Sequence, residues 1–323
     1  MIFRKLGRRT LSIAALGAAI GAGVFVSDRA AKREAAAEAA YPPTGQILNV
    51  DGIKVHADVQ GSGPDLVLIH GSSGNTRDFT FSLVDKLKDD YRVIVIDRPG
   101  LGWTDRMNKR PESITDQARL LQAAAAQLGA TRPIVLGQSY GGAVALAWAV
   151  NHPDNLAALV LVAAGSQRWQ GGLSGYYKLT SSKIGQKLAV PFFTAFVGRA
   201  RVEAALDEIF APQTTPPGYG DYIGVGLTLR RASIAANADQ RASLKAEITA
   251  QQPQYVNIGV PTEMIHGDAD TTVPLEIHAK PLARQIKGAN LVTLPGIGHM
   301  PHHVAQADVR AAIDRAATRA GLR

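Results

Sequence analysis

Short apolar runs alternate with longer helical stretches along most of this chain, and this order constrains the fold more than any other feature. The runs with strand character include residues 65–70, 92–97, 132–137 and 156–164. The run "DLVLIH" is nearly continuous in apolar residues, as expected of a parallel strand that is buried on both faces. Strands that alternate with helices predict an α/β fold, with a parallel sheet covered by helices on both faces.

Further segments complete the predicted sheet. Two strand-like segments come before these runs and two after them, so we expect an eight-stranded, mostly parallel sheet; these segments are residues 46–50, 53–59, 261–267 and 289–295. Helices are expected near residues 76–88, 113–128 and 139–151, and after each of the last two strands. The alternation lapses between Gly165 and about Pro253, where turn clusters such as "APQTTPPGYG" occur. We interpret this segment, at about residues 166–255, as a helical cap inserted after the sixth strand.

The composition suits one large globular domain with an insertion. The chain has 323 residues, of which 46% are hydrophobic and 19% are charged, and this is too apolar for a disordered protein. The formal net charge is +8, but no basic run is interleaved with aromatic residues, so no nucleic-acid partner is expected. The absence of cysteine excludes disulfides and thiol nucleophiles. No cluster has metal-ligand spacing and no phosphate loop is present, so we predict neither a metal nor a cofactor.

Residues 1–45 are interpreted as an N-terminal segment that precedes the main domain at 46–323. A basic stretch from Arg4 to Arg9 is followed by an uncharged run from Thr10 to Val26, and then by a charged, Ala-rich spacer. As a helix, the uncharged run would be about 25 Å long, near the lower limit for crossing a bilayer core. We therefore expect a transmembrane anchor, with the main domain on the exported side of the membrane.

A cleaved signal peptide is the alternative. The sequence "RRTLS" before the weakly hydrophobic run is similar to a twin-arginine signal, and cleavage would give a secreted protein. The nearest Ala-x-Ala site, at residues 37–39, is distant from the run, and Asp28 and Arg29 intervene. The anchor is therefore favoured, although basic residues on both sides of the run set its orientation only weakly.

Ser139 lies within a Gly-x-Ser-x-Gly motif, between a strand-like run and a run of small residues. Gly137 and Gly141 flank it at two residues on either side. A sharp strand-to-helix turn would expose the serine hydroxyl, and it requires glycine at these positions because side chains there would collide. The backbone N–H of the next residue, Tyr140, would then face a developing oxyanion. This motif predicts a nucleophilic serine.

The chain resembles the α/β-hydrolase superfamily from about Gln46 to its end. The resemblance rests on several motifs in one order: "HGSSG", "DRPGLGWTD", "GQSYGG", "HGDADTTVP" and "PGIGHMPHH". It implies that His299 is the general base, and that Asp270 orients it, with Asp268 as the less favoured acid. It also implies an oxyanion hole formed by the backbone N–H groups of Ser72 and Tyr140. His302 and His303 lie where the last helix should begin, so we expect surface or packing roles for them.

The resemblance implies a serine hydrolase that cleaves an ester-type bond of a small-molecule acyl substrate through an acyl-enzyme. Haloalkane dehalogenases and epoxide hydrolases are similar in fold but carry aspartate where this chain has Ser139. An acyltransferase, a cofactor-free perhydrolase and a non-catalytic binding protein remain as alternatives. Trp103 and Phe193 are the candidate substrate-binding residues. Packing in the core is the competing role for Trp103. For the phenylalanines around Phe193, the competing roles are core packing and contact with a membrane surface.

Overall fold

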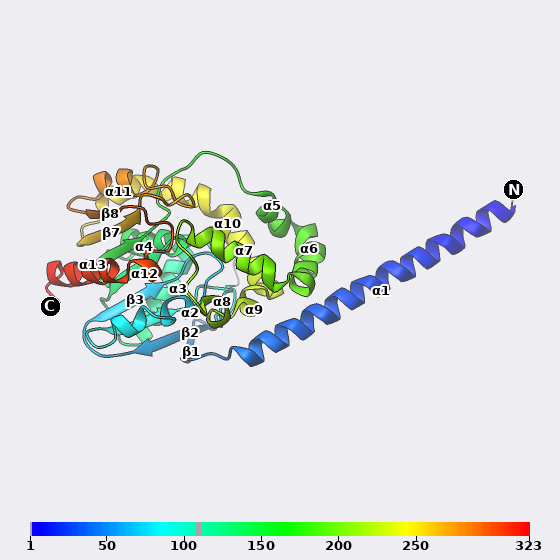
Figure 1. Cartoon of the computed structure of the whole chain (residues 1–323), viewed down its shortest axis with the longest axis horizontal. Coiled ribbons are helices and arrows are strands. Elements are labelled where there is room, and N and C mark those ends of the chain that lie inside the picture. The colour runs from blue at the N-terminus through cyan, green and yellow to red at the C-terminus, as the bar shows by residue number, and fades with distance from the viewer. Residues whose placement is uncertain (1, 108–110) are drawn as a thin grey trace.

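The computed structural model describes the backbone of residues 2–107 and 111–323, and all their side chains except those of residues 2–17 and 19. Eight strands form one sheet in the order β1-β2-β4-β3-β5-β6-β7-β8 (Figure 1). Strand β2 runs antiparallel to both its neighbours, and the other neighbouring strands pair in parallel. The strands are β1 (Gln46–Val50), β2 (Ile53–Gln60), β3 (Asp65–Ile69), β4 (Arg92–Ile96), β5 (Ile134–Gln138), β6 (Ala158–Val162), β7 (Thr262–Gly267) and β8 (Asn290–Leu294). The prediction of a mostly parallel eight-stranded sheet is confirmed.

Helices cover both faces of this sheet, and each face has its own hydrophobic core. Alternate residues of β3 point to opposite faces, so that Val67 and Ile69 belong to one core and Leu66 and Leu68 to the other. The first core is completed by α3 (Ile114–Gln127), α4 (Tyr140–Asn151) and α11 (Ala279–Gln285). The second is completed by α2 (Arg77–Thr80), the 3₁₀ helix η1 (Val84–Lys86) and α13 (Gln306–Arg319). The central strands are therefore apolar on both sides, as their sequences indicate.

The predicted helices are found with small differences in their bounds. Helix α3 begins directly after Ser113, whose Oγ accepts a hydrogen bond from the backbone N–H of Asp116 and caps the helix. The helix expected at residues 76–88 is instead divided into α2 and η1. The aromatic and β-branched residues between Phe79 and Phe81 have low helix propensity, and packing of the segment against the sheet outweighs helix continuity there.

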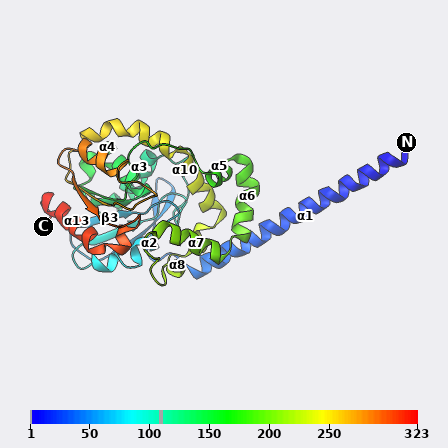
Figure 2. The ribbon, with the colours of Figure 1, turned by 45° about the horizontal axis from the view of Figure 1, so that its top comes forward.

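Six α-helices lie between β6 and β7, all within the described residues. They are α5 (Gly175–Ser181), α6 (Lys183–Phe196), α7 (Arg199–Phe210), α8 (Tyr219–Tyr222), α9 (Val225–Thr228) and α10 (Arg231–Gln251). Helices α5 to α8 gather at the end of the molecule from which the N-terminal helix departs (Figure 2). All six helices, α5 to α10, are called the cap helices below, and the division of the chain into domains stays a prediction.

A single helix, α1 (Ile2–Ala40), contains both the uncharged run and the Ala-rich segment that was expected to be a spacer. Its second half is docked on the cap helices, because Ala30 and Ala37 are buried and Glu34 forms an ion pair with Arg231 of α10. The first half extends away from the body of the protein (Figure 1). The side chains of Arg4 to Arg9, and those of the first half of the uncharged run, lie outside the described residues. No helix in the described part of the chain has the length and apolar character needed to span a membrane, so the expected transmembrane helix is not supported.

Candidate active site

Ser139 lies at the turn between β5 and α4, in a strained backbone conformation. Its φ of 52° is in the left-handed region, which only glycine adopts without strain. The flanking glycines make this turn possible. A Cβ on Gly137 would lie 2.3 Å from the carbonyl oxygen of Gly141, and a Cβ on Gly141 would lie 2.1 Å from that of Ile69. The residue types around Ser139 are therefore dictated by close backbone approach, as expected from the motif.

The loops after β7 and β8 bring two further polar residues to Ser139. The Nε2 atom of His299 lies 2.9 Å from Ser139 Oγ, and its Nδ1 atom lies 2.8 Å from Asp270 Oδ2. Asp270 and His299 are buried, while Ser139 is partly exposed. The three residues come from loops that are far apart in the sequence but meet at the carboxyl ends of the parallel strands β5, β7 and β8. The structure thus brings together the serine, histidine and aspartate that the sequence motifs single out.

Asp270 is held as a carboxylate by its surroundings. Burial alone would raise its pKa, but hydrogen bonds from His266 and His299 and from the backbone N–H of Val273 outweigh this effect and lower the pKa. The Oδ1 atom accepts hydrogen bonds from the N–H groups of Thr272 and Val273, which fix its orientation. Asp268, the alternative acid, is exposed and accepts a hydrogen bond from the N–H of Gly296 instead. A charged Asp270 can stabilise a protonated His299.

The loop after β3 adjoins the serine. A Cβ on Gly71 would lie 3.2 Å from Ser139 Cβ. The carbonyl oxygen of Gly71 accepts a hydrogen bond from the guanidinium of Arg98, and since the C=O and N–H of a trans peptide point in opposite directions, the N–H of Ser72 points away from Arg98. Tyr140 is the first residue of α4, so its N–H has no partner within the helix. Among the described residues, neither of these N–H groups has a protein acceptor.

Arg98 is a residue that the sequence did not single out. It is fully buried, binds the carbonyl oxygens of His70 and Gly71, and lies over the ring of Tyr140 at 4.2 Å. Burial lowers its pKa to about 10, which leaves it charged at neutral pH. Two glutamines, Gln117 and Gln240, accept its remaining hydrogen bonds. The only available signal was its place in "DRPG", and its target carbonyls lie far from it in the sequence.

A cap residue also holds the loop after β3. Asn237 of α10 accepts a hydrogen bond from the N–H of Ser73 and donates one to the hydroxyl of the same residue. The hydroxyl of Thr228 donates to the Ser73 carbonyl oxygen. Ser73 has a φ of 58°, so this loop conformation is strained and is stabilised from the cap side. The cap helices thus contribute to the shape of the site.

The two candidate substrate-binding residues contact the N-terminal segment and the cap. Trp103 donates its indole N–H to the carbonyl oxygen of Tyr41, and Arg230 lies over its ring. Phe193 is half-buried in α6, in ring contact with Tyr176 of α5.

A cavity of about 250 Å³ lies among the cap helices. Its walls include Trp169, Leu173, Tyr177, Arg241 and Lys245. The hydroxyl of Tyr177 accepts a hydrogen bond of 3.4 Å from Asn237, the residue that holds Ser73. The cavity therefore adjoins the residues that shape the loop after β3.

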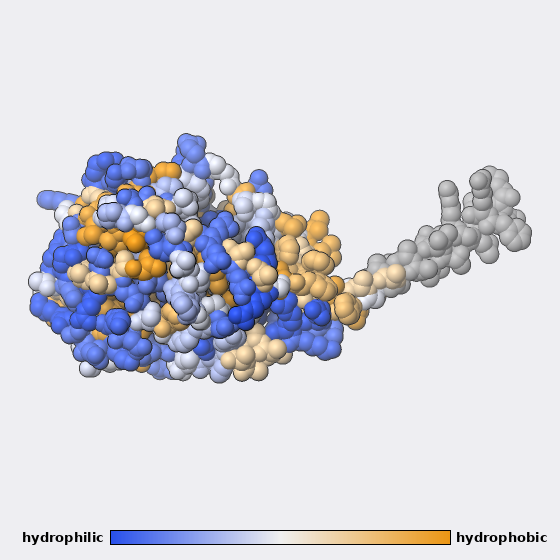
Figure 3. Space-filling view, viewed as in Figure 1, coloured by the Kyte–Doolittle hydropathy of each residue, from blue (hydrophilic) through white to orange (hydrophobic). Residues whose placement is uncertain are grey.

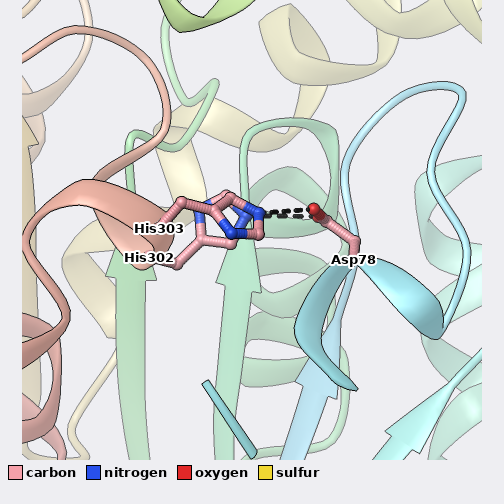
Figure 4. A group of neighbouring side chains, drawn as sticks. All are labelled: Asp78, His302 and His303. Atoms are coloured by element: carbon pink, nitrogen blue, oxygen red, sulfur yellow. Dashed lines mark hydrogen bonds and ion pairs between the residues drawn. The ribbon is translucent and has the colours of Figure 1, made fainter. Parts of the chain in front are cut away.

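A second buried polar cluster lies beside the site (Figure 4). The Nε2 atoms of His303 and His302, both on α12 (Pro301–Val304), lie 2.8 and 3.2 Å from the two carboxylate oxygens of Asp78. Tyr219 of α8 donates its hydroxyl to the same carboxylate. Burial favours the neutral carboxyl, but the two histidines outweigh it and hold the pKa of Asp78 well below its usual value. The cluster joins α2, a cap helix and the helix that follows His299.

This cluster is the group of histidine and acidic side chains in the described part of the chain that comes closest to a metal site. Its geometry suits a hydrogen-bonded cluster better than a metal site. Both Nε2 atoms already face the carboxylate, and neither Nδ1 atom has a partner among the described residues. A metal-bound histidine normally donates its other N–H to a carboxylate, a carbonyl or water. His302 and His303 thus have the expected packing role, against the rings of Phe79 and Tyr219, and they also form a buried hydrogen-bonded cluster.

Comparison with known proteins identifies the family. The model of the α/β hydrolase fold matches residues 64–306, and the chain belongs to this family. An uncharacterized protein of Mycobacterium tuberculosis is 27% identical over 284 residues, which cover 81% of this chain and 77% of that protein. A 2-hydroxy-6-oxononadienedioate/2-hydroxy-6-oxononatrienedioate hydrolase of Klebsiella pneumoniae is 26% identical over 273 residues, which cover 79% of this chain and 89% of that protein. The prediction of a hydrolase is confirmed at the level of the family.

The same fold occurs in solved structures. A thermophilic esterase from Thermogutta terrifontis superposes with a TM-score of 0.68 at 21% sequence identity, and the match covers 84% of this chain and 99% of the esterase. At 21% identity, this similarity shows that the two proteins share a fold.

Proposed function

We propose that the protein is a serine hydrolase that cleaves a carboxylic ester through an acyl-enzyme intermediate. The observation that carries this proposal is the hydrogen-bonded chain from Ser139 Oγ to His299 and on to Asp270, with distances of 2.9 and 2.8 Å. A serine hydroxyl is a weak nucleophile on its own, and a histidine within hydrogen-bond reach activates it. Esters are the substrates of the structurally similar thermophilic esterase, which supports this choice of bond.

In the first half of the reaction, Ser139 Oγ attacks the acyl carbon while its proton passes to His299 Nε2. The negative charge of the tetrahedral intermediate develops on the former carbonyl oxygen. His299 then gives the proton to the departing alcohol oxygen, the ester C–O bond breaks, and the acyl group stays on Ser139. Asp270 keeps the His299 ring oriented and stabilises its protonated form.

In the second half, water replaces the alcohol. His299 removes a proton from water, whose oxygen attacks the acyl carbon, and the bond to Ser139 Oγ then breaks as His299 returns the proton to the serine. The products are a carboxylic acid and the free enzyme. In both halves, the unpartnered N–H groups of Ser72 and Tyr140 are the proposed donors to the oxyanion, and each such donor typically contributes ~10²–10³ in rate.

The place where the substrate binds is also a proposal. The cap cavity that adjoins Asn237 is the candidate site for the acyl or alcohol group, and Phe193 supports its wall through Tyr176 and Tyr177. Trp103 remains a candidate for lining the approach between the N-terminal segment and the cap. Acyl transfer to an alcohol and perhydrolysis use the same three residues, and addition of an alcohol or peroxide to the assay distinguishes them from hydrolysis.

Hydrolysis of a p-nitrophenyl ester series from acetate to palmitate tests this function, with Ser139→Ala as the matched variant. We expect activity in the natural chain, and a loss of about 10⁶-fold in the variant. A fluorophosphonate should label only the natural chain. Equal activity in both proteins would mean that Ser139 is not the nucleophile. A folded chain that neither hydrolyses esters nor takes the label would favour the non-catalytic alternative.

Export of residues 46–323, with retention at the membrane through the N-terminal segment, is likewise a proposal. It rests on the basic stretch and the uncharged run that follows it. Secretion after signal cleavage is the alternative. A C-terminal alkaline phosphatase fusion should be active if the domain is exported, and the size of the cell-associated protein distinguishes a retained segment from a cleaved one.

A further inference from the structure

One end of the molecule presents a group of large apolar side chains to solvent. Four of them lie four residues apart on α6, and three lie on α1. Together they form the apolar face, which consists of Ile184, Leu188, Phe192, Phe196, Ile20, Val24 and Phe25. Ile184 and Leu188 are 72% and 70% exposed. Figure 3 shows hydrophobic residues gathered at this end of the protein, where α1 departs. Soluble monomers rarely expose a contiguous apolar group of this kind, and when they do it generally marks an interaction site.

The apolar face is one continuous surface with side chains from two helices. The ring of Phe25 lies 6.4 Å from that of Phe196, which lies 4.8 Å from that of Phe192. Two arginines of α1 fix the helices together, because Arg29 and Arg33 donate hydrogen bonds to the carbonyl oxygens of Ala195 and Val197. These carbonyls lie at or just beyond the C-terminal end of α6, where unpaired oxygens and the helix dipole favour a cation.

Positively charged side chains lie beside the α6 part of the apolar face. Lys183 and Lys187 are exposed on α6, and each is next in sequence to a residue of the apolar face. Helix α6 contains no acidic residue. No ion pair to either lysine is found among the described residues. An apolar stripe beside unpaired lysines is the pattern of a helix that lies in the interface of an anionic bilayer. It suits a second protein chain less well, because charged residues, lysine among them, are depleted from the centres of such interfaces.

The position of α1 supports the same partner. Beyond Ile20, toward its N-terminus, this helix continues the uncharged run that starts at Thr10, and the basic stretch from Arg4 to Arg9 precedes that run. The apolar face is therefore continuous, through one helix, with a segment of the same apolar-and-basic composition.

We propose that the apolar face binds the surface of an anionic lipid bilayer. In this arrangement Leu188 and Phe192 enter the boundary between headgroups and acyl chains, and Lys183 and Lys187 pair with lipid phosphates. The cap helices, and not the N-terminal segment alone, then rest on the membrane. This interface does not depend on the ester hydrolysis proposed above.

The absence of cysteine allows a site-specific test in the full-length chain. The variant Leu188→Cys is labelled with an environment-sensitive fluorophore, and vesicles of phosphatidylcholine with or without phosphatidylglycerol are added. We expect the emission of the label to shift to the blue with the anionic vesicles. The control is the same label on the variant Val256→Cys, because Val256 is an exposed apolar residue (59% exposed) of the 3₁₀ helix Gln252–Asn257. This label should not shift.

The lysines are tested by the double variant Lys183→Gln, Lys187→Gln in the labelled chain. Its affinity for anionic vesicles should fall by on the order of 30-fold, since each lysine near such a surface contributes to binding. The proposal is overturned if the label at position 188 does not shift, if both labels shift equally, or if the lysine variant binds as tightly as its parent. A blue shift without vesicles that disappears on dilution would show that a second copy covers the face, and this too would overturn it. Thermal unfolding of each variant confirms that the chain is folded.

Discussion

The guanidinium of Arg98 donates a hydrogen bond of 2.9 Å to the carbonyl oxygen of Gly71, and this contact sets the direction of the next N–H group, that of Ser72. The same side chain binds the carbonyl oxygen of His70 at 3.0 Å. A buried cation thus fixes the backbone of the loop whose N–H is the proposed oxyanion donor. Arg98 does not reach Ser139 and acts as a positioning residue.

Replacing Arg98 by methionine should lower kcat toward p-nitrophenyl acetate by roughly 10- to 100-fold, because the Ser72 N–H is then no longer held in place. KM should change little, since the interaction is made in the transition state. Arg98→Lys, which keeps the charge and one donor, should recover part of the loss. A folded Arg98→Met enzyme with unchanged kcat would contradict the positioning role.

Asp270 and Asp268 form a natural pair of test and control. Asp270→Asn should lower kcat by about 10⁴-fold, because an amide cannot stabilise the protonated form of His299 and favours the wrong ring tautomer. Asp268→Asn should leave kcat within a few-fold of the natural enzyme, since this exposed residue only binds the Gly296 N–H. Steady-state kinetics on one soluble ester measures both. The reverse ranking of the two variants would assign the acid to Asp268.

Gly141→Ala should destabilise the fold and reduce activity together. The added Cβ would lie 2.1 Å from the carbonyl oxygen of Ile69, so the turn that carries Ser139 must move. We expect a loss of about 1–3 kcal/mol in the free energy of unfolding, measured by urea denaturation. Gly259→Ala is the matched control, because no atom beyond its two chain neighbours lies within 4 Å of the position of its added Cβ. Similar stability of both variants would count against close packing at the turn.

His278 should make the protein less stable in acid. Its Nδ1 accepts hydrogen bonds from the N–H groups of Ser166 and Gln167, and burial lowers its pKa from 6.5 to about 4. Below pH 6.5 the unfolded chain binds a proton that the folded chain does not bind until about pH 4. The stabilising contribution is therefore complete above pH 6.5 and is lost as the pH falls toward 4, by at most about 1.4 kcal/mol per pH unit.

The variant His278→Asn keeps an acceptor but cannot be protonated. The slope of the free energy of unfolding against pH should decrease by about one proton between pH 6.5 and 4. Urea denaturation at several pH values measures this slope. An unchanged slope would show that His278 does not contribute to acid lability.

Phe193→Ala tests the proposed support of the cap cavity. Loss of the ring removes its contact with Tyr176, whose ring lies 5.1 Å from that of the cavity residue Tyr177. We expect kcat/KM to fall more for long-chain than for short-chain p-nitrophenyl esters. A uniform fall across the series would indicate a general packing role instead.

Much of the fold was predictable from local sequence. A strand buried on both faces must be apolar throughout, so the continuous apolar runs predicted the strands β3 to β6. The end of α3 was also indicated locally, because Gly129 stands where a helix stop is expected, and in the structure its φ is 84°. The helix expected over residues 76–88 is divided where Phe79 packs in the core of the sheet and Phe81 packs against Tyr219 of the cap, and packing of this kind has no local signature.

The residues of the site also differ in whether the local sequence predicts them. Ser139 was identifiable because its turn allows only glycine at two nearby positions, and such a constraint is written in consecutive residues. His299 and Asp270 followed from the order of motifs, since parallel strands bring their carboxyl ends to one edge of the sheet. Asn237, by contrast, is a polar residue inside a helix, and nothing near it in the sequence indicates that it binds Ser73.

The sheet, the turn at Ser139 and the family were therefore predictable from the amino-acid order, because these depend on burial patterns and backbone constraints between near neighbours. The use of the cap and of the N-terminal helix was visible only in the three-dimensional fold. The fold pairs Asp78 with His302 and His303, more than 200 residues away, and it docks α1 on α6 to form a single apolar face. Such contacts join side chains whose chemistry is common everywhere in a chain, and only the path of the folded backbone selects which of them meet.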